Sequence, residues 1–167
     1  DGLIAAAWNN FTDTLLRRVK PSKMKPVQGD PYQATPKVIG INYLVTQYSL
    51  DKDTRRLRVN TRYDSDAYPL PPKRITFTEI RDLARSLDPE DLVTNMRKEG
   101  AGAILVDRHG NVIEANDTVL ALLYAKQNEP ELFKKYQAVL NKNAKAYGFQ
   151  DYTVDKEYKD VQLKTVK

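Results

Sequence analysis

The chain has 167 residues, a formal net charge of +5 and no cysteine. This length fits one domain that can bury a substantial core without covalent staples, and the absence of cysteine excludes disulfides and thiolate chemistry. No apolar run approaches the roughly 20 residues that a membrane-spanning helix needs, and the excess of basic residues permits an acidic partner without requiring one. Because the sequence starts at Asp1 rather than at an initiator Met, we expect a fragment or a processed piece.

Residues 1–20 are predicted to form an amphipathic helix. Apolar residues recur at intervals of three and four, which places on one stripe Ile4, Trp8, Phe11, Leu15 and Leu16. Such a stripe packs on the domain's own core, which is the commoner arrangement, or it binds a partner protein or a second copy of the chain. Both outcomes remain open for the Ile4/Trp8/Phe11/Leu15 stripe.

The next segment is basic and rich in proline. No acid lies between Thr14 and Gly29, and four prolines lie between Pro21 and Pro36. This composition favours an extended arm, so we expect residues 1–36 to form a separate N-terminal unit. Its candidate nucleic-acid contacts are Arg17, Arg18, Lys20 and Lys23.

Residues 38–63 predict a β-hairpin. Residues 38–50 are rich in Val, Ile, Tyr and Thr, residues 51–54 form a turn, and the return strand at residues 55–63 alternates. One face of that strand consists of three arginines and one asparagine: Arg56, Arg58, Asn60 and Arg62. A row of arginines beside tyrosines can follow a phosphate backbone. The commoner alternative is a solvated face that protects a sheet edge from aggregation.

Two helices are predicted after a proline-containing loop at residues 64–72. The first begins with a capping box, Thr76-Phe77-Thr78-Glu79, and its apolar face consists of Ile80, Leu83, Ala84 and Leu87. Arg81 and Arg85 lie four residues apart on the opposite side. The second helix is short, with Asp88 as its cap and Pro89 as its first helical residue.

Residues 103–125 predict a strand, a tight turn, a second strand and a helix. Residues 103–106 are apolar, residues 107–110 form a turn in which Gly110 takes a positive φ, and residues 111–114 are extended. The helix begins at Asn116-Asp117-Thr118. A last helix is predicted at residues 131–147, followed by a polar tail at residues 149–167, which is a strand or a linker.

The stretch from Gly102 to Ala125, GAILVDRHGNVIEANDTVLALLYA, resembles the ParB/sulfiredoxin-like superfamily, most closely the DdrB-type ParB-like domain of large phage and conjugative-element proteins. In that branch the second strand is followed by Gly-Asn-Gly-Arg and an apolar Leu-Ala-Leu helix, which Asn116 and Leu120-Ala121-Leu122 match. The resemblance covers roughly Asn60 to Gly148. It implies an α+β fold, a small mixed β-sheet packed by helices, for residues 37–148 including the leading hairpin.

The chain departs from the family pattern where the resemblance implies a nucleotide phosphate. Ala115-Asn116-Asp117-Thr118 replaces Gly-Asn-Gly-Arg, so a threonine stands for the phosphate-binding arginine and an acid for the second glycine. A carboxylate there caps the helix and satisfies its dipole, worth about 0.3–1 kcal/mol. We predict a degenerate nucleotide pocket, to which a basic pair of the family pattern also contributes: Asn116, Asp117, Thr118, Lys73 and Arg74.

Two other interpretations of this stretch remain open. Asp117 and Thr118 are helix caps that never bound a ligand, or the site has been rebuilt for a divalent cation with Asp107, Glu114 and Asp117, at a spacing that matches no standard loop. His109 is the only histidine and lies in a predicted turn beside Gly110. We therefore expect neither a Ser-His-Asp triad nor a two-histidine metal site within one chain. We predict no catalytic residue, no metal and no cofactor, and the missing cysteine excludes sulfiredoxin chemistry.

Three functions follow from these observations. The first is a non-enzymatic ParB-like module of a phage or mobile-element protein that binds DNA or a protein partner, in the bacterial cytoplasm or in a virion. The second is a nucleotide-dependent hydrolase or nuclease whose phosphate grip has moved to Lys73, Arg74 or Arg108. The third is a structural domain of a larger polypeptide.

Overall fold

The computed structural model describes residues 3–9, 22–24, 32–51, 53–90, 92 and 104–142. Its elements, in chain order, are β1 (Leu3–Asn9), β2 (Ser22–Met24), β3 (Tyr32–Gly40), a 3-10 turn (Ile41–Tyr43), β4 (Tyr48–Asp51), β5 (Arg56–Val59), α1 (Phe77–Ser86), β6 (Leu105–Val106), β7 (Val112–Glu114), α3 (Asn116–Asn128) and α4 (Pro130–Lys142). Strands and helices mixed in this way confirm the predicted α+β class.

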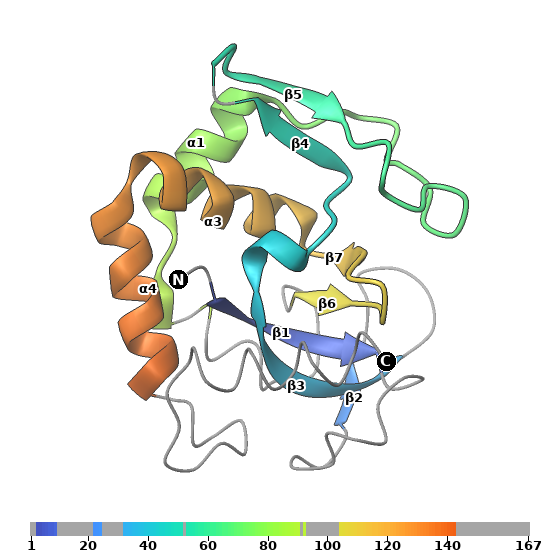
Figure 1. Cartoon of the computed structure of the whole chain (residues 1–167), viewed down its shortest axis with the longest axis horizontal. Helices are drawn as coiled ribbons and strands as arrows, with labels where there is room; N and C mark the ends of the chain where they lie inside the picture. The colour runs from blue at the N-terminus through green and yellow to red at the C-terminus, as the bar shows by residue number, and fades with distance from the viewer. Residues whose placement is uncertain are drawn as a thin grey trace.

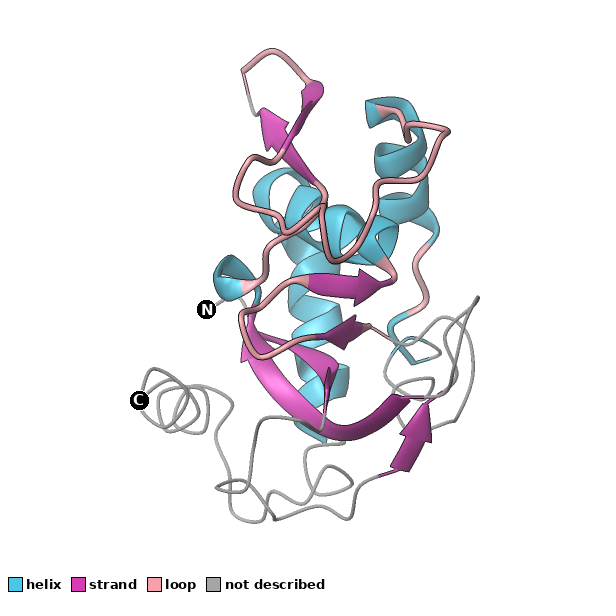
Figure 2. Cartoon of the chain, turned by 90° about the vertical axis from the view of Figure 1, so that its right-hand side faces the viewer, coloured by secondary structure: helices cyan, strands magenta, loops and turns pink. Residues whose placement is uncertain are grey.

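A five-stranded sheet and a separate hairpin form the β-structure. The sheet has the order β2-β3-β1-β6-β7, in which β1 and β6 are parallel and the other neighbours antiparallel, so it is the predicted small mixed sheet. The second sheet is the β4–β5 hairpin. Figures 1 and 2 place this hairpin at the opposite end of the molecule from β2 and β3, with α3 between them.

The predicted N-terminal helix is wrong over Leu3–Asn9, which is the strand β1. Its residues are apolar almost throughout, and a short apolar run of this kind fits a central strand as well as a helix. Pairing on both sides decides the conformation, because Trp8 is in register with Thr35 of β3 and with Val106 of β6. Ile4 and Trp8 therefore do not belong to a helical stripe. Phe11 and Leu15 lie outside the described residues.

The predicted extended arm also contains regular structure. β2 pairs with β3, and the expected boundary at residue 36 falls inside β3. β2 pairs with β3 only as far as Ala34, so Pro36 lies where β3 has no partner on that side among the described strands. A proline is tolerated at such an edge because it has no amide to donate.

The predicted hairpin is confirmed but is shorter than expected. Val38 belongs to β3 rather than to the hairpin, which pairs Tyr48 with Val59 at one end and Asp51 with Arg56 at the other. Beyond Val59 the chain turns, and the predicted return strand does not extend to Tyr63.

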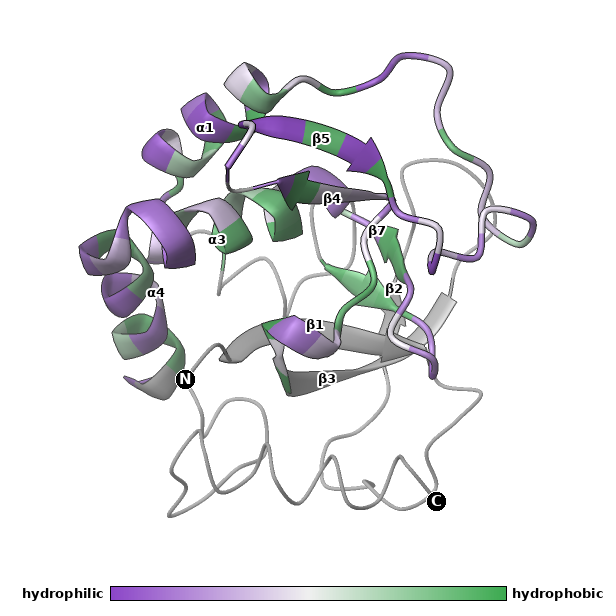
Figure 3. Cartoon of the chain, turned by 45° about the horizontal axis from the view of Figure 1, so that its top comes forward, coloured by the Kyte–Doolittle hydropathy of each residue, from purple (hydrophilic) through white to green (hydrophobic). Residues whose placement is uncertain are grey.

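α3 is the central helix, because it contributes side chains to two hydrophobic clusters. Val119, Leu122 and Ala125 pack with the sheet and α4. Leu120, Ala121 and Tyr124 pack with the hairpin and α1. A helix that is apolar around its circumference is typically buried on all sides. Figure 3 shows the contrast with α1 and β5, in which hydrophilic residues are prominent.

Two helix starts follow the predicted capping signals. Thr76 caps α1 by accepting a hydrogen bond from the Glu79 amide at 3.2 Å, which confirms it as the N-cap. Asp88 accepts one from the Glu90 amide at 3.0 Å. α4 begins one residue earlier than predicted, at Pro130, and residues 143–147 lie outside the described part. None of the described helices has the length and apolar character to cross a membrane.

Candidate functional site

The turn at residues 107–110 is held by a buried carboxylate. Asp107 accepts hydrogen bonds from the amides of His109 and Asn111, each at 2.9 Å, and from the Tyr68 hydroxyl at 2.9 Å. Gly110 has a φ of 86°, as predicted. Asp107 therefore fixes the connection between β6 and β7.

Asn116 links the start of α3 to the chain that leads into the hairpin. Its Nδ2 donates to the Val112 carbonyl at 2.8 Å, and its Oδ1 accepts from the Gln47 amide at 2.9 Å. The buried Tyr63 hydroxyl donates to the same Val112 carbonyl at 2.7 Å. Burial raises the pKa of Tyr63 above its ordinary value, so the hydroxyl keeps its proton at neutral pH and remains a donor.

Asp117 accepts a hydrogen bond from the Thr118 amide at 2.8 Å. The prediction that Asp117 and Thr118 are N-cap residues is wrong in position, because Ala115 precedes the first helical residue, Asn116. The carboxylate nevertheless takes one of the free amides of the first turn and lies at the positive end of the helix dipole.

A cavity of about 250 Å³, here called the Lys73 cavity, lies at this helix start. It brings together three of the five residues predicted for the degenerate nucleotide pocket, Lys73, Asn116 and Asp117. The other lining residues are Gln47, Tyr48, Pro71, Ile75, Ile113, Ala115 and Leu120. Arg74 instead donates to the Leu57 carbonyl and lies 5.2 Å from the centre of the Tyr48 ring. Thr118 is not among the described residues that line the cavity.

Ala115 has φ 66° and ψ 39°, a left-handed conformation that costs a residue with a Cβ about 1–2 kcal/mol. We expect Ala115→Gly to stabilise the protein by about 0.5–1 kcal/mol, because glycine adopts this conformation without strain but loses more chain entropy on folding. Urea unfolding measures the difference. Ala121→Gly, inside α3, is the matched control and is expected to destabilise; a loss of stability in Ala115→Gly would contradict the prediction.

All three arginines predicted as the nucleic-acid surface of the return strand are exposed, and two of them lie on the hairpin. Arg56 and Arg58 are exposed on β5, with the buried Leu57 between them. Arg58 lies 3.2 Å from Asp51. Hydrogen bonds from Thr54 and Asp53, with a smaller contribution from the charge of Arg58, lower the pKa of Asp51.

The predicted alternation holds only from Arg56 to Arg58. Val59 is 50% exposed although it was expected on the inner face, and Arg62 lies in the turn after the strand. Of the basic candidates near the N-terminus, Lys23 belongs to β2. Arg17, Arg18 and Lys20 lie outside the described residues, as does the tail at residues 149–167.

The predicted cation alternative has no geometric support in the described part of the chain. No group of three or more His, Cys, Asp or Glu side chains is placed there to hold a metal ion. Of the three acids proposed for it, Asp107 accepts hydrogen bonds from amides of its own turn, and Asp117 accepts one from the Thr118 amide. His109 is exposed and accepts a hydrogen bond from Arg108 at 3.2 Å.

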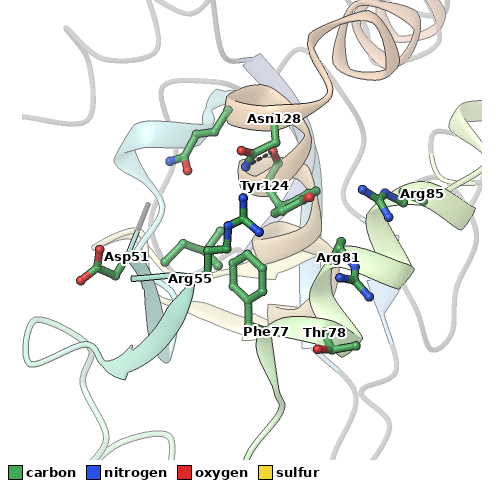
Figure 4. Close-up of a pocket in the computed structure, with 10 residues that line it drawn as sticks. Asp51, Arg55, Phe77, Thr78, Arg81, Arg85, Tyr124 and Asn128 are labelled. Atoms are coloured by element: carbon green, nitrogen blue, oxygen red, sulfur yellow. Dashed lines mark hydrogen bonds between the residues drawn. The ribbon is translucent and has the colours of Figure 1, made fainter. Parts of the chain in front are cut away.

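A second cavity, of about 350 Å³, was not predicted from the sequence. It lies between the hairpin turn, α1 and the C-terminal part of α3, and it is here called the arginine cavity (Figure 4). Its three arginines are Arg55, Arg81 and Arg85. The spacing of Arg81 and Arg85 along α1 was visible in the sequence, but their meeting with Arg55 depends on the packing of α1 against the hairpin.

Comparison with known proteins supports the resemblance. The family model of the ddrB-like ParB superfamily domain matches residues 28–167. The chain therefore belongs to the ParB superfamily, as one of its ddrB-like domains. The match is longer than the expected stretch from Asn60 to Gly148, since it also includes β3, the hairpin and the tail. No curated protein and no solved structure matches the chain.

Proposed function

We propose that this ParB-like domain is a non-catalytic module that binds DNA through the arginines of its hairpin. The observation that carries the proposal is the contact between Asp117 and the Thr118 amide. A phosphate at this helix start would have to displace a carboxylate of the same sign from its amide. The Lys73 cavity is therefore a poor phosphate site, and we look for the DNA-binding residues on another surface.

The exposed face of β5 supplies that surface. Arg56 and Arg58 lie two residues apart on one strand, so both side chains leave the same face. The Arg58 side chain is 71% exposed, and an exposed ion pair such as the one with Asp51 contributes little to stability. Arg58 can exchange this carboxylate for a DNA phosphate, with release of counterions from the DNA.

We expect labelled single- or double-stranded DNA to bind the intact chain in fluorescence anisotropy, with an affinity that falls steeply with salt. The double variant Arg56→Gln, Arg58→Gln is expected to weaken binding and to reduce the salt slope by about two, because each lost phosphate contact removes about one. Lys135→Gln on α4, which also removes an exposed cation, is the matched control. Wild-type affinity in the double variant would contradict the proposal.

A nucleotide-dependent hydrolase or nuclease is the second candidate, because Lys73 lines the cavity at the start of α3. The same titration with a nucleoside triphosphate and magnesium tests it. Lys73→Gln is a cleaner variant than a change at Arg74, which also holds the Leu57 carbonyl of the hairpin. Nucleotide binding that Lys73→Gln abolishes favours the enzyme, and no binding at millimolar nucleotide excludes it.

The biological setting is part of the proposal. The DdrB-type branch supports a phage or mobile-element protein, acting in the bacterial cytoplasm or in a virion. If the chain binds neither DNA nor nucleotide, a protein-binding or purely structural domain of a larger polypeptide becomes the better account.

A further inference from the structure

We infer that the arginine cavity binds a nucleotide whose phosphate pairs with Arg81 and Arg85. The cavity adjoins Tyr124, Gln127 and Asn128, whereas the Lys73 cavity adjoins Asn116 and Asp117. The two cavities share no lining residue, and their nearest lining residues on α3, Leu120 and Tyr124, lie four residues or about 6 Å apart along the helix. The inference therefore concerns a second site and does not depend on the proposed function.

The charge of the cavity favours an anion. Among the described residues that line it are three arginines and one carboxylate, Asp51. That carboxylate already accepts hydrogen bonds from the amides of Asp53 and Thr54, at 3.0 and 3.1 Å, and it lies 3.2 Å from Arg58. Asp51 is thus engaged within the hairpin, and the lining carries more positive than negative side chains.

The arginines of α1 have partners that a phosphate can replace. Arg81 lies 3.2 Å from Asp82, and Arg85 lies 3.1 Å from Glu129. The two arginine side chains are 38% and 56% exposed, and pairs of such exposure contribute little. Arg81 donates through two nitrogens to one oxygen of Asp82, whereas a phosphate offers a guanidinium two parallel charge-assisted hydrogen bonds to separate oxygens.

The hairpin turn holds Arg55 in an unusual conformation. Its φ is 53°, a left-handed value that glycine or asparagine adopts more readily than arginine. The Arg55 amide donates to the Asp51 carbonyl at 3.0 Å, which closes the turn. Figure 4 shows Arg55 on one side of Phe77 and Tyr124, with Arg81 and Arg85 on the other. Backbone outliers of this kind concentrate at ligand sites.

The floor of the cavity suits the organic part of a nucleotide. Phe77 is half-buried and meets the Tyr124 ring edge-on, with 5.7 Å between the ring centres. A base or sugar can lie against the open side of Phe77, since aromatic rings accept any base. Phe77 and Thr78 also form the first turn of α1, where the positive end of the helix dipole favours phosphate. The volume of about 350 Å³ falls within the range of small-molecule sites, roughly 300–1,000 Å³.

The intact chain is titrated with three probes, and binding is measured by calorimetry and by the shifts of amide NMR signals. The probes are inorganic phosphate, nucleoside monophosphates and a short single-stranded oligonucleotide with a 5′-phosphate. We expect saturable binding that the double variant Arg81→Gln, Arg85→Gln weakens about tenfold or more, since two charged contacts are lost. Lys135→Gln, which removes an exposed cation from α4, is the control and is expected to bind as the wild type does. Unchanged thermal unfolding of the double variant excludes a folding defect.

The arms of this experiment separate the sources of the phosphate. Binding of monophosphates that the double variant weakens supports the inference with a free nucleotide as ligand. Binding of the oligonucleotide alone supports it, with a DNA strand as ligand, when Arg81→Gln, Arg85→Gln weakens the binding. Saturable binding of none of the three probes, or equal binding by the double variant, overturns it. The single variant Arg56→Gln removes a hairpin arginine and leaves both the lining of the arginine cavity and the Arg58–Asp51 pair in place, so the DNA proposal and this inference fail independently.

Discussion

Gly110→Ala is expected to destabilise the protein by about 3 kcal/mol or more. The residue has a φ of 86°, and a Cβ there would lie 2.4 Å from the Tyr43 carbonyl oxygen. Backbone atoms cannot yield as a flexible side chain does. Movement would also strain the bridge to the preceding segment, where the Val45 amide donates to the Gly110 carbonyl at 2.8 Å.

Urea unfolding followed by circular dichroism measures this loss. His109→Ala is the matched control, because the neighbouring side chain is exposed and a surface change of this kind stays within about 0.5 kcal/mol. A loss of less than about 1 kcal/mol in Gly110→Ala would show that the turn accommodates a Cβ, and it would contradict the prediction that this position requires glycine.

Leu120→Ala is expected to cost about 2–5 kcal/mol, as other deletions of fully buried leucines do. Leu120 is fully buried in the cluster that joins α3 to the hairpin and α1. The cavity left behind weakens the support of both elements. We therefore expect amide hydrogen exchange to accelerate first in β4, β5 and α1, and the DNA binding proposed for the hairpin to weaken with it.

Leu122→Ala is the matched comparison, since it deletes the same atoms from the other face of α3. Leu122 is 2% exposed and packs in the cluster of the sheet and α4. We expect a similar loss of stability, with faster exchange in β6, β7 and α4. Identical exchange patterns in the two variants would contradict the division into two clusters and would indicate one cooperative core.

Local signals predicted much of the fold. The N-cap at Thr76, the turn at Gly110 and the start of α3 at Asn116 each depend on a few adjacent residues, and the structure confirms all three. The hairpin turn was predicted for the same reason. The length of the hairpin was not predicted, because β5 ends at Val59, opposite the first residue of its partner strand β4, Tyr48.

The wrong or missed features depend on contacts between distant residues. β1 was predicted as a helix because an apolar run such as Leu3–Asn9 carries no signal for its neighbours β3 and β6. The Lys73 cavity was anticipated only in its composition, through a family resemblance. The arginine cavity was not anticipated, because nothing near Arg55 in sequence indicates that α1 packs beside it.

The position of β1 has a consequence for the order of events during synthesis. Residues 60–76 join the hairpin to α1 and residues 87–115 lead from α1 to α3, so their cluster closes with shorter loops than the pairing of β1 with β6 does. Ala7 of β1, by contrast, pairs with Leu105, about 100 residues later, and closing such a loop is slow. While the ribosome is still translating, β1 has β3 on one edge but an open edge on the other. An N-terminal strand with an open edge is the part of this chain that a chaperone has most reason to shield.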